Sequence, residues 1–509
     1  MKAEAGLGAI VTRKLYILSF AAVVLMAVIL RIYKAYYTGV IYDEALTYFR
    51  FSRSLDSAVS NYSSTNNHVL NSVLIYLSTR GLGQLGSFMW VPAIRLPAVF
   101  FGLVYVASIS LIIALAIKNR IIKFLLLGAC LFNYFLFDLS ILARGYALAL
   151  GAVYLELLLV VLYPTYLRGR DRMMVFLFSG LNFIALGGML TSFYTIVPVN
   201  LAFLAVACHS KINTGLKRPS TLIRAIQTGV AIMCISACAL VLLYSRLITK
   251  IVSVSGKKSE INNPLSTILT SLTDEGLFLK SQFYHFHPEA IIQLIMLPAL
   301  AVLAILFILN LLINKKTVTP AAAIIILVLA ASFSLAYAAR TAGGVSLGFT
   351  RNHVFWLPLM FLSVGIITEG ALALLEPHII TPLALKACIY VLASVIFFSS
   401  IILITGPIAS TQVVTTHDWA AQSVVAPLIR QLHKTDPTRH WRLGFSDKLE
   451  YNLYPYLFYN AEVYRIIDAD IAVYPLSEQA LHGGIFYEYD LFKKFDCVVV
   501  PVRLGLFHN

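Results

Sequence analysis

Apolar runs of about twenty residues recur along the chain and decide its fold class. A bilayer core is crossed by roughly 20 apolar residues in an α-helix, which satisfies all of its own backbone hydrogen bonds. Such runs occupy residues 15–37, 91–117, 121–138, 143–163, 173–190, 193–208, 223–246, 289–313, 320–339, 354–374 and 384–406. Charged residues make up only 12% of the chain, against about 25% in soluble domains. The sequence therefore predicts an α-helical polytopic membrane protein with about eleven spans.

Two of these spans are ambiguous. Gly187, Gly188 and Pro198 interrupt the region from 173 to 208, which is therefore either one broken helix or two short ones. The apolar core of the first span is followed by Arg31 and by no small-residue cleavage site. We therefore expect it to be a retained anchor and not a signal peptide.

Basic residues set the predicted orientation. The net charge of +15 is concentrated in short loops, where basic residues mark the cytoplasmic side, so a nucleic-acid partner is not expected. Five clusters fall on one side if the spans alternate: Arg13-Lys14, Lys118/Arg120/Lys123, Arg168/Arg170/Arg172, Lys211/Lys217/Arg218 and Lys315-Lys316. We expect a multi-pass protein of the plasma (inner) membrane, with a cytoplasmic N-terminus and an extracytoplasmic C-terminal region.

The chain divides into two predicted domains. Residues 1–406 form the transmembrane module, with outer loops at 38–90, 247–288 and 340–353. Residues 407–509 are more polar and alternate helix-like segments with the strand-like runs HWRLGF, VYRIID and CVVVPV. This alternation favours a small extracytoplasmic α/β domain.

An adjacent acid pair, Asp43 and Glu44, opens the first outer loop. Apolar residues at helical spacing predict an amphipathic helix from Ala45 to Val59, with Leu46, Phe49, Leu55 and Ala58 on its apolar face. Two carboxylates side by side repel each other, which raises one pKa and suits a general base. The alternative is that both acids only complement the dipole of a surface helix.

A second amphipathic helix is predicted to begin near His68, with Val69, Leu70, Val73, Leu74 and Leu77 on one side. Asn66 or Asn67 is its expected cap, and His68 is either functional or simply part of this helix start. In the loop at 247–288, His285 and His287 lie close to Glu289 in a spacing that permits a metal. An aromatic return to the membrane interface explains that segment equally well, so we expect no metal.

Several arginines lie at the predicted outer ends of spans: Arg144, Arg246, Arg340 and Arg351. A guanidinium group binds phosphate oxygens bidentately, so as a set they favour an anionic headgroup site. Individually, each is also explained as a residue that reaches the membrane interface. Glu156 lies within a span and is either paired with a neighbour or lines a cavity.

Four ordered segments resemble a known family: YDEALTYF, NNHVLNSVL, IRLPAVFFGLVYVASI and LARGYALAL. They are similar to the N-terminal half of C-type (GT-C) glycosyltransferases that use polyprenyl-phosphate sugars. The group of protein O-mannosyltransferases and aminoarabinose transferases is the most similar. The resemblance covers residues 15–165 and extends to the later spans only in general layout.

The resemblance implies a role for particular residues. The family's Asp-Glu motif in the first outer loop maps to Asp43, implied as the catalytic base, with Glu44 beside it. Its histidine motif maps to His68, next to Asn67, although here valine and leucine follow where the family often has prolines. The arginine of a further family segment maps to Arg144, with Tyr146 beside it. Arg246 and Arg351 are expected to bind substrate from their positions alone.

These expectations combine into one mechanism. The donor is a sugar on a polyprenyl phosphate, and Asp43 takes a proton from an acceptor hydroxyl that attacks the anomeric carbon with inversion. Lipid phosphate is a good leaving group, so no cofactor is required, and a divalent metal is possible but not expected. The acceptor is a lipid, a glycan or a protein.

Other functions share some of these features. A transporter or flippase of lipid-linked sugar also needs many spans and a cavity lined by arginines, but the paired repeats common in transporters are not evident. A polysaccharide polymerase or ligase is expected to keep its main site in a later outer loop, and the loop at 247–288 leaves that open.

Overall fold

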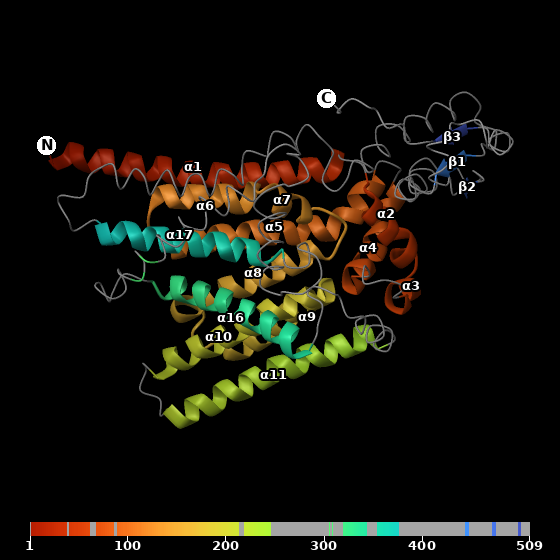
Figure 1. Cartoon of the computed structure of the whole chain (residues 1–509). Coiled ribbons are helices and arrows are strands. Elements are labelled where there is room, and N and C mark those ends of the chain that lie inside the picture. Colours follow the sequence, from red (N-terminus) through yellow and green to blue (C-terminus); the bar gives the residue numbers. More distant parts are fainter. Residues whose placement is uncertain are drawn as a thin grey trace. The chain divides into compact units, whose positions relative to one another are not determined.

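The computed structural model describes part of the chain, in which α-helices predominate (Figure 1). The described residues are 2–37, 40–61, 68–85, 89–212, 218–245, 305, 308, 319–343, 354–375, 443–446, 471–474 and 497–499. The chain forms two compact units. Unit 1 comprises Met1–Ala35, Tyr62–Asn71 and Pro97–Ile408, and unit 2 comprises Tyr36–Asn61, Ser72–Leu96 and Ala409–Asn509.

Seven helical segments among the described residues are long and apolar enough to cross a membrane. They are Lys14–Tyr37, Trp90–Ala116, Tyr146–Leu167, Leu190–Ser210, Gln227–Tyr244, Pro320–Ala339 and Trp356–Ala373. They belong to α1 (Lys2–Tyr37), α5 (Trp90–Ala116), α8 (Tyr146–Leu162), α10 (Phe193–Ile212), α11 (Arg218–Tyr244), α16 (Pro320–Gly343) and α17 (Trp356–Leu375). Each matches a predicted span. The predicted span 384–406 lies outside the described residues, as does 289–313 apart from Ile305 and Ile308. The chain is a helical membrane protein.

The predicted span 121–138 is wrong as a single helix. It is divided into α6 (Arg120–Phe132) and α7 (Tyr134–Leu139). Asn133 separates them because its backbone leaves the helical region, with φ −54° and ψ 124°. Its side-chain oxygen accepts a hydrogen bond from the Leu136 N–H at 3.1 Å and caps α7.

The ambiguous region from 173 to 208 forms two helices. The first, α9 (Asp171–Gly188), ends at the glycine pair, and a 3₁₀ turn, η5 (Leu190–Ser192), leads into α10. A Cβ atom on Gly188 would lie 2.8 Å from the Leu148 Cβ atom, so α9 approaches α8 too closely there for a side chain. Pro198 lies inside α10, where a membrane helix tolerates it.

The core of unit 1 is built around α8, which packs against α9 and α10 (Figure 1). Almost every residue of α8 is buried, so its continuous apolar sequence is that of a helix enclosed by other helices. The Tyr154 hydroxyl on this helix donates a hydrogen bond to the Phe355 carbonyl at 2.8 Å. Nearby, the Trp356 indole N–H donates to the Thr195 hydroxyl at 2.9 Å. These bonds satisfy polar groups that would otherwise be costly inside the membrane module.

Unit 2 holds most of the predicted first outer loop as a series of short helices. These are α2 (Tyr42–Thr47), a π-helix η1 (Tyr48–Ser52), α3 (Leu55–Ser60), α4 (Val69–Gly81), which begins in unit 1, and a 3₁₀ turn η2 (Leu82–Leu85). The continuous helix predicted from Ala45 to Val59 is therefore wrong. Ser54 interrupts it with an extended backbone, and its hydroxyl caps α3 by accepting from the Ser57 N–H at 3.1 Å.

The second predicted helix of this loop is confirmed, since α4 begins directly after His68. Its expected cap, Asn66 or Asn67, lies outside the described residues. Two residues assigned to buried faces are in fact exposed: Leu55 by 49% and Leu77 by 57%. Both follow the helical spacing, but no neighbouring element among the described residues covers them.

In the C-terminal region, three parallel strands pair in the order β2-β1-β3. They are β1 (Leu443–Ser446), β2 (Ile471–Tyr474) and β3 (Cys497–Val499), and Leu443 is opposite Ile471 on one side and Cys497 on the other. β1 and β3 fall at HWRLGF and CVVVPV, whereas VYRIID lies outside the described residues and β2 follows it. The α/β domain as a whole stays a prediction.

Candidate functional site

Glu44 in unit 2 is held by a buried arginine. The Arg95 Nε donates to Glu44 Oε1 at 2.7 Å, and its Nη2 donates to Oε2 at 2.5 Å. Glu44 Oε2 also accepts from the Ile41 N–H at 3.1 Å, which closes the first turn of α2. Glu44 is fully buried and Arg95 is 1% exposed, so this bidentate ion pair is shielded from water.

The neighbouring acid, Asp43, has a different environment. Its side chain is partly exposed, in the first turn of α2. Its carbonyl oxygen accepts from the Thr47 hydroxyl at 2.7 Å, which ties its backbone to the end of the same short helix. The predicted repulsion between the two carboxylates did not take Arg95 into account. The positive charge of its guanidinium group balances the negative charge of the Glu44 carboxylate. Arg95 lies inside a predicted span, and a lone cation in an apolar run was the signal that could have revealed it.

In unit 1, three predicted site residues come together. The Nδ1 atom of His68 hydrogen-bonds to the Gly188 carbonyl at 2.7 Å, and this bond requires a proton on Nδ1. The His68 ring contacts the Tyr146 ring edge-on, with centroids 5.4 Å apart. The Arg144 guanidinium carbon lies 5.9 Å from the centre of the same tyrosine ring. We call this set, His68, Arg144 and Tyr146, the histidine–arginine cluster.

The segment that carries Arg144 is a buried loop between α7 and α8. Arg144 is only 1% exposed, so it is enclosed by protein and does not reach out to the interface. The Asn71 side chain of α4 donates to the Ala143 carbonyl at 3.2 Å and holds the loop from one side. Gly145 is required by space, because a Cβ atom there would lie 1.9 Å from the Gly188 carbonyl oxygen.

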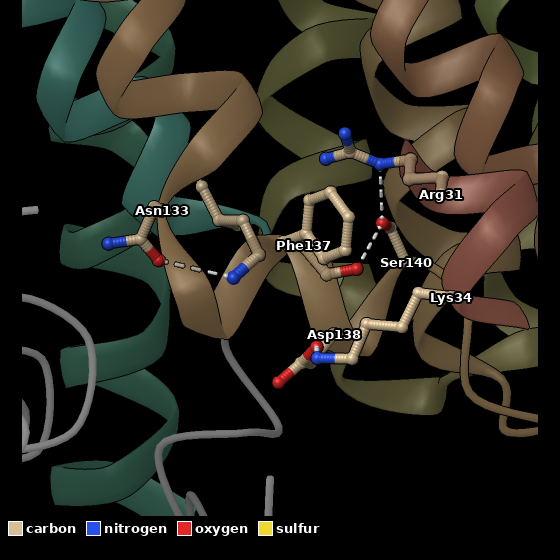
Figure 2. A network of polar contacts seen from close by, with 7 residues as sticks. Arg31, Lys34, Asn133, Phe137, Asp138 and Ser140 are labelled. Carbon is tan, nitrogen blue, oxygen red and sulfur yellow. Dashed lines mark hydrogen bonds and ion pairs between the residues drawn. The ribbon is translucent and has the colours of Figure 1, made fainter. Parts of the chain in front are cut away.

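Two cations of α1 contact the end of α7, directly before this loop (Figure 2). Lys34 pairs with Asp138 at 2.5 Å, and both side chains are buried. The Arg31 Nε donates to the Ser140 hydroxyl at 2.9 Å, while its Nη2 donates to a carbonyl of α6 at 2.9 Å. Both cations also lie over the Phe137 ring, at 4.6 Å for Arg31 and 5.6 Å for Lys34. We call this set the α1–α7 network.

The α1–α7 network is not evident from the sequence. Arg31 flanks the apolar core of the first span, and Asp138 lies at the end of the run predicted to be one apolar helix. Both positions are charged residues within apolar runs, which is the pattern typical of paired or functional groups in membranes. The network fixes the backbone that leads into Arg144, so it supports the cluster without belonging to it.

The remaining predicted site residues lie outside the described part of the chain. These are Asn67, Arg246 and Arg351, together with the loop at 247–288, its residues His285 and His287, and Glu289 directly after it. Arg340 lies on α16, and its side chain is not described. Within the described ranges, no group of three or more His, Cys, Asp or Glu residues could hold a metal ion.

Comparisons with known proteins complete the description. No protein-family model matches the sequence, and no curated protein matches it. Among solved structures, the chain is similar to the crystal structure of an oligosaccharyltransferase of Archaeoglobus fulgidus in complex with zinc and sulfate. The TM-score is 0.40 at 12% sequence identity, over 83% of this chain and 60% of that one. The chain thus spans less than two thirds of that protein's length, and its candidate site is defined by its own residues.

Proposed function

We propose that the protein is a membrane glycosyltransferase that moves a sugar from a polyprenyl-phosphate donor to a hydroxyl acceptor on the extracytoplasmic side. The observation that carries the proposal is that Asp43 and Glu44 have different environments. Glu44 is buried and neutralised by Arg95, whereas Asp43 is partly exposed on the helix turn that this ion pair anchors. A partly exposed carboxylate on a fixed turn is suited to accept a proton from a substrate.

In the proposed reaction, Asp43 takes the proton of the acceptor hydroxyl as its oxygen attacks the anomeric carbon. The bond between that carbon and the phosphate oxygen breaks, and its electron pair leaves with the polyprenyl phosphate. Attack from the side opposite the phosphate inverts the anomeric configuration. The products are the glycosylated acceptor, polyprenyl phosphate and a protonated Asp43.

Negative charge grows on the leaving phosphate, so fixed cations there would lower the barrier. We assign this role to Arg144, because its guanidinium group is enclosed by protein and its loop is fixed on two sides. His68 and Tyr146 orient it, with Asn67, Arg246 and Arg351 as further proposed contacts to the substrates. The reaction as written requires no metal, since the lipid phosphate leaves as a stable anion.

The test is transfer of radiolabelled sugar by the purified protein from a panel of polyprenyl-phosphate sugars, with native membrane lipid extract as acceptor. We expect Asp43→Asn to abolish transfer while the thermal unfolding temperature stays that of the wild type. Asp56→Asn is the matched control, because Asp56 is also an acid in the first turn of a short helix, α3. It should leave transfer intact. Full activity of Asp43→Asn would refute the assignment of the base.

The alternative functions predict other outcomes of the same assay. A carrier of lipid-linked sugar would show no transfer by the wild type, but the donor would raise its unfolding temperature. A polymerase would give products that grow by repeated units. Either result would replace the proposal.

A further inference from the structure

Glu156 is a buried acid that the proposed reaction does not use. It lies in α8, ten residues after Tyr146, which places it about 15 Å along the helix axis from the histidine–arginine cluster. Its side chain is fully buried. Neither carboxyl oxygen has a hydrogen-bond partner among the described residues. Buried polar groups almost always have such a partner, so an exception of this kind needs an explanation.

The position of Glu156 on α8 shows which elements surround it. Residues three, four and seven positions away share its helix face, and these include Ala149 and Tyr163. A side chain on Gly188 of α9 would lie 3.4 Å from the Ala149 nitrogen. The Tyr163 ring packs edge-on against Phe203 of α10, with centroids 5.2 Å apart. Glu156 therefore lies on the face of α8 that packs against α9 and α10.

In the described part of α9, α10 and α16, no charged residue lies level with Glu156 along the helices. The titratable residues of α9, α10 and α16 all lie near helix ends: Asp171, Arg172, Tyr194, Cys208, His209, Lys211, Tyr337 and Arg340. On α8 itself, the Tyr154 hydroxyl is hydrogen-bonded to the Phe355 carbonyl. Directly after α8, the Tyr163 hydroxyl is hydrogen-bonded to Asp171 at 2.7 Å. An ionised carboxylate in such a place would cost many kcal/mol, and a buried acid of this kind keeps its proton instead.

We propose that Glu156 is a proton-binding site inside the membrane module, occupied by a proton when α8, α9 and α10 are packed together. A metal cation is the less suitable ligand, because Ca²⁺ takes six to eight oxygens and Mg²⁺ about six. The apolar residues on this face supply none: Ala149, Ala152, Val153 and Val160. Separation of α9 or α10 from α8 would admit water and let the proton leave. Glu156 therefore links the packing of these three helices to proton release.

The experiment is infrared difference spectroscopy of the purified protein in lipid nanodiscs at neutral pH, comparing the wild type with Glu156→Gln. A protonated carboxyl group has a C=O stretch that a carboxylate lacks. We expect the wild type to show one acid C=O band that is missing in the variant. Since glutamine is a neutral isostere of the protonated acid, the unfolding temperature should be the same in both.

Glu369→Gln is the matched control. Glu369 on α17 accepts hydrogen bonds from the N–H groups of Lys118 and Asn119 at 2.7 and 2.6 Å, so its charge is stabilised. This substitution should remove carboxylate bands and leave the acid band unchanged. Should Glu156→Gln not fold, Glu156→Asp keeps a carboxyl group and shifts the same band.

The result that overturns the proposal is an acid band that persists in Glu156→Gln, or a difference spectrum that shows only carboxylate bands. Either would mean that Glu156 is ionised and has a cationic partner. A second readout is transfer into D₂O, which shifts the acid band at the rate at which solvent reaches the group. Complete exchange within the mixing time would also overturn it, because the site would then be hydrated and not enclosed.

Discussion

Removal of Arg95 is the sharpest test of how the first outer loop is built. In Arg95→Leu, the fully buried Glu44 carboxylate loses two hydrogen bonds and its counter-charge, while its hydrogen bond to the Ile41 N–H remains. Breaking a buried ion pair on one side costs about 3–5 kcal/mol, because the remaining charge is buried without compensation. Folding free energies are only about 5–15 kcal/mol, so the loss is a large share of the total.

The double variant Glu44→Leu/Arg95→Leu separates this mechanism from simple loss of packing. With both charges replaced by apolar side chains, the main loss is the hydrogen bond to the Ile41 N–H, which costs about 1–3 kcal/mol. We therefore expect the double variant to be more stable than Arg95→Leu alone. Arg95→Lys should fall between Arg95→Leu and the wild type, since lysine keeps the charge but not the bidentate geometry.

The measurement is thermal and urea-induced unfolding of the purified variants in one detergent. Tryptophan fluorescence is a suitable probe, because Trp90 in unit 2 packs edge-on against Tyr48, with centroids 5.9 Å apart. The single variant Glu44→Leu completes the comparison. A loss of stability in the double variant equal to the sum of the losses in Arg95→Leu and Glu44→Leu would refute the reasoning, because a coupled pair must be non-additive. Loss of transfer by Arg95→Leu at unchanged stability would instead give Arg95 a direct role with the substrate.

Two further predictions concern unit 1. Gly145→Ala should destabilise the protein by about 1–3 kcal/mol or more, because the new methyl group would overlap a backbone carbonyl of α9. Gly180→Ala is the control, since nothing lies within 4 Å of its Cβ position. The same unfolding assay should find this control neutral or slightly stabilising. Lys34→Met should lower the free energy of unfolding by about 3–5 kcal/mol, because the Asp138 carboxylate stays buried without this counter-charge. Adding Asp138→Leu should recover most of that loss. A loss in the double variant equal to the sum of the losses in the two single variants, Lys34→Met and Asp138→Leu, would contradict the pairing.

Much of the fold could be predicted from the sequence because membrane helices obey a local rule. A run of about 20 apolar residues satisfies its own backbone within the bilayer, so its existence does not depend on distant contacts. Seven predicted spans are found as helices for this reason. The breaks are less visible in the sequence. Asn133 and Ser54 each begin a new helix through a capping hydrogen bond, but neither residue type excludes a continuous helix.

The candidate site divides in the same way. Residue type and order pointed to Asp43 and Arg144, because an acid pair after a span and an arginine opening one are conspicuous in an apolar sequence. His68 stayed open on the residues alone, and only the resemblance of the four segments to a known family added Tyr146. Their environments were not predictable. His68 and Gly188 are 120 positions apart, and no local pattern indicates that a histidine will hydrogen-bond to the end of a particular helix.

By itself, then, the sequence determined that this chain is a helical membrane protein and which few polar residues are candidates for chemistry. Only the tertiary structure decided which groups surround each of them. Folding pairs Glu44 with Arg95 and encloses Arg144 in a loop that α1 and α4 hold by hydrogen bonds. It leaves the Glu156 carboxyl group without a hydrogen-bond partner among the described residues. The physical reason is that hydropathy acts within one segment, whereas the state of a buried charge depends on groups that folding brings from elsewhere in the chain.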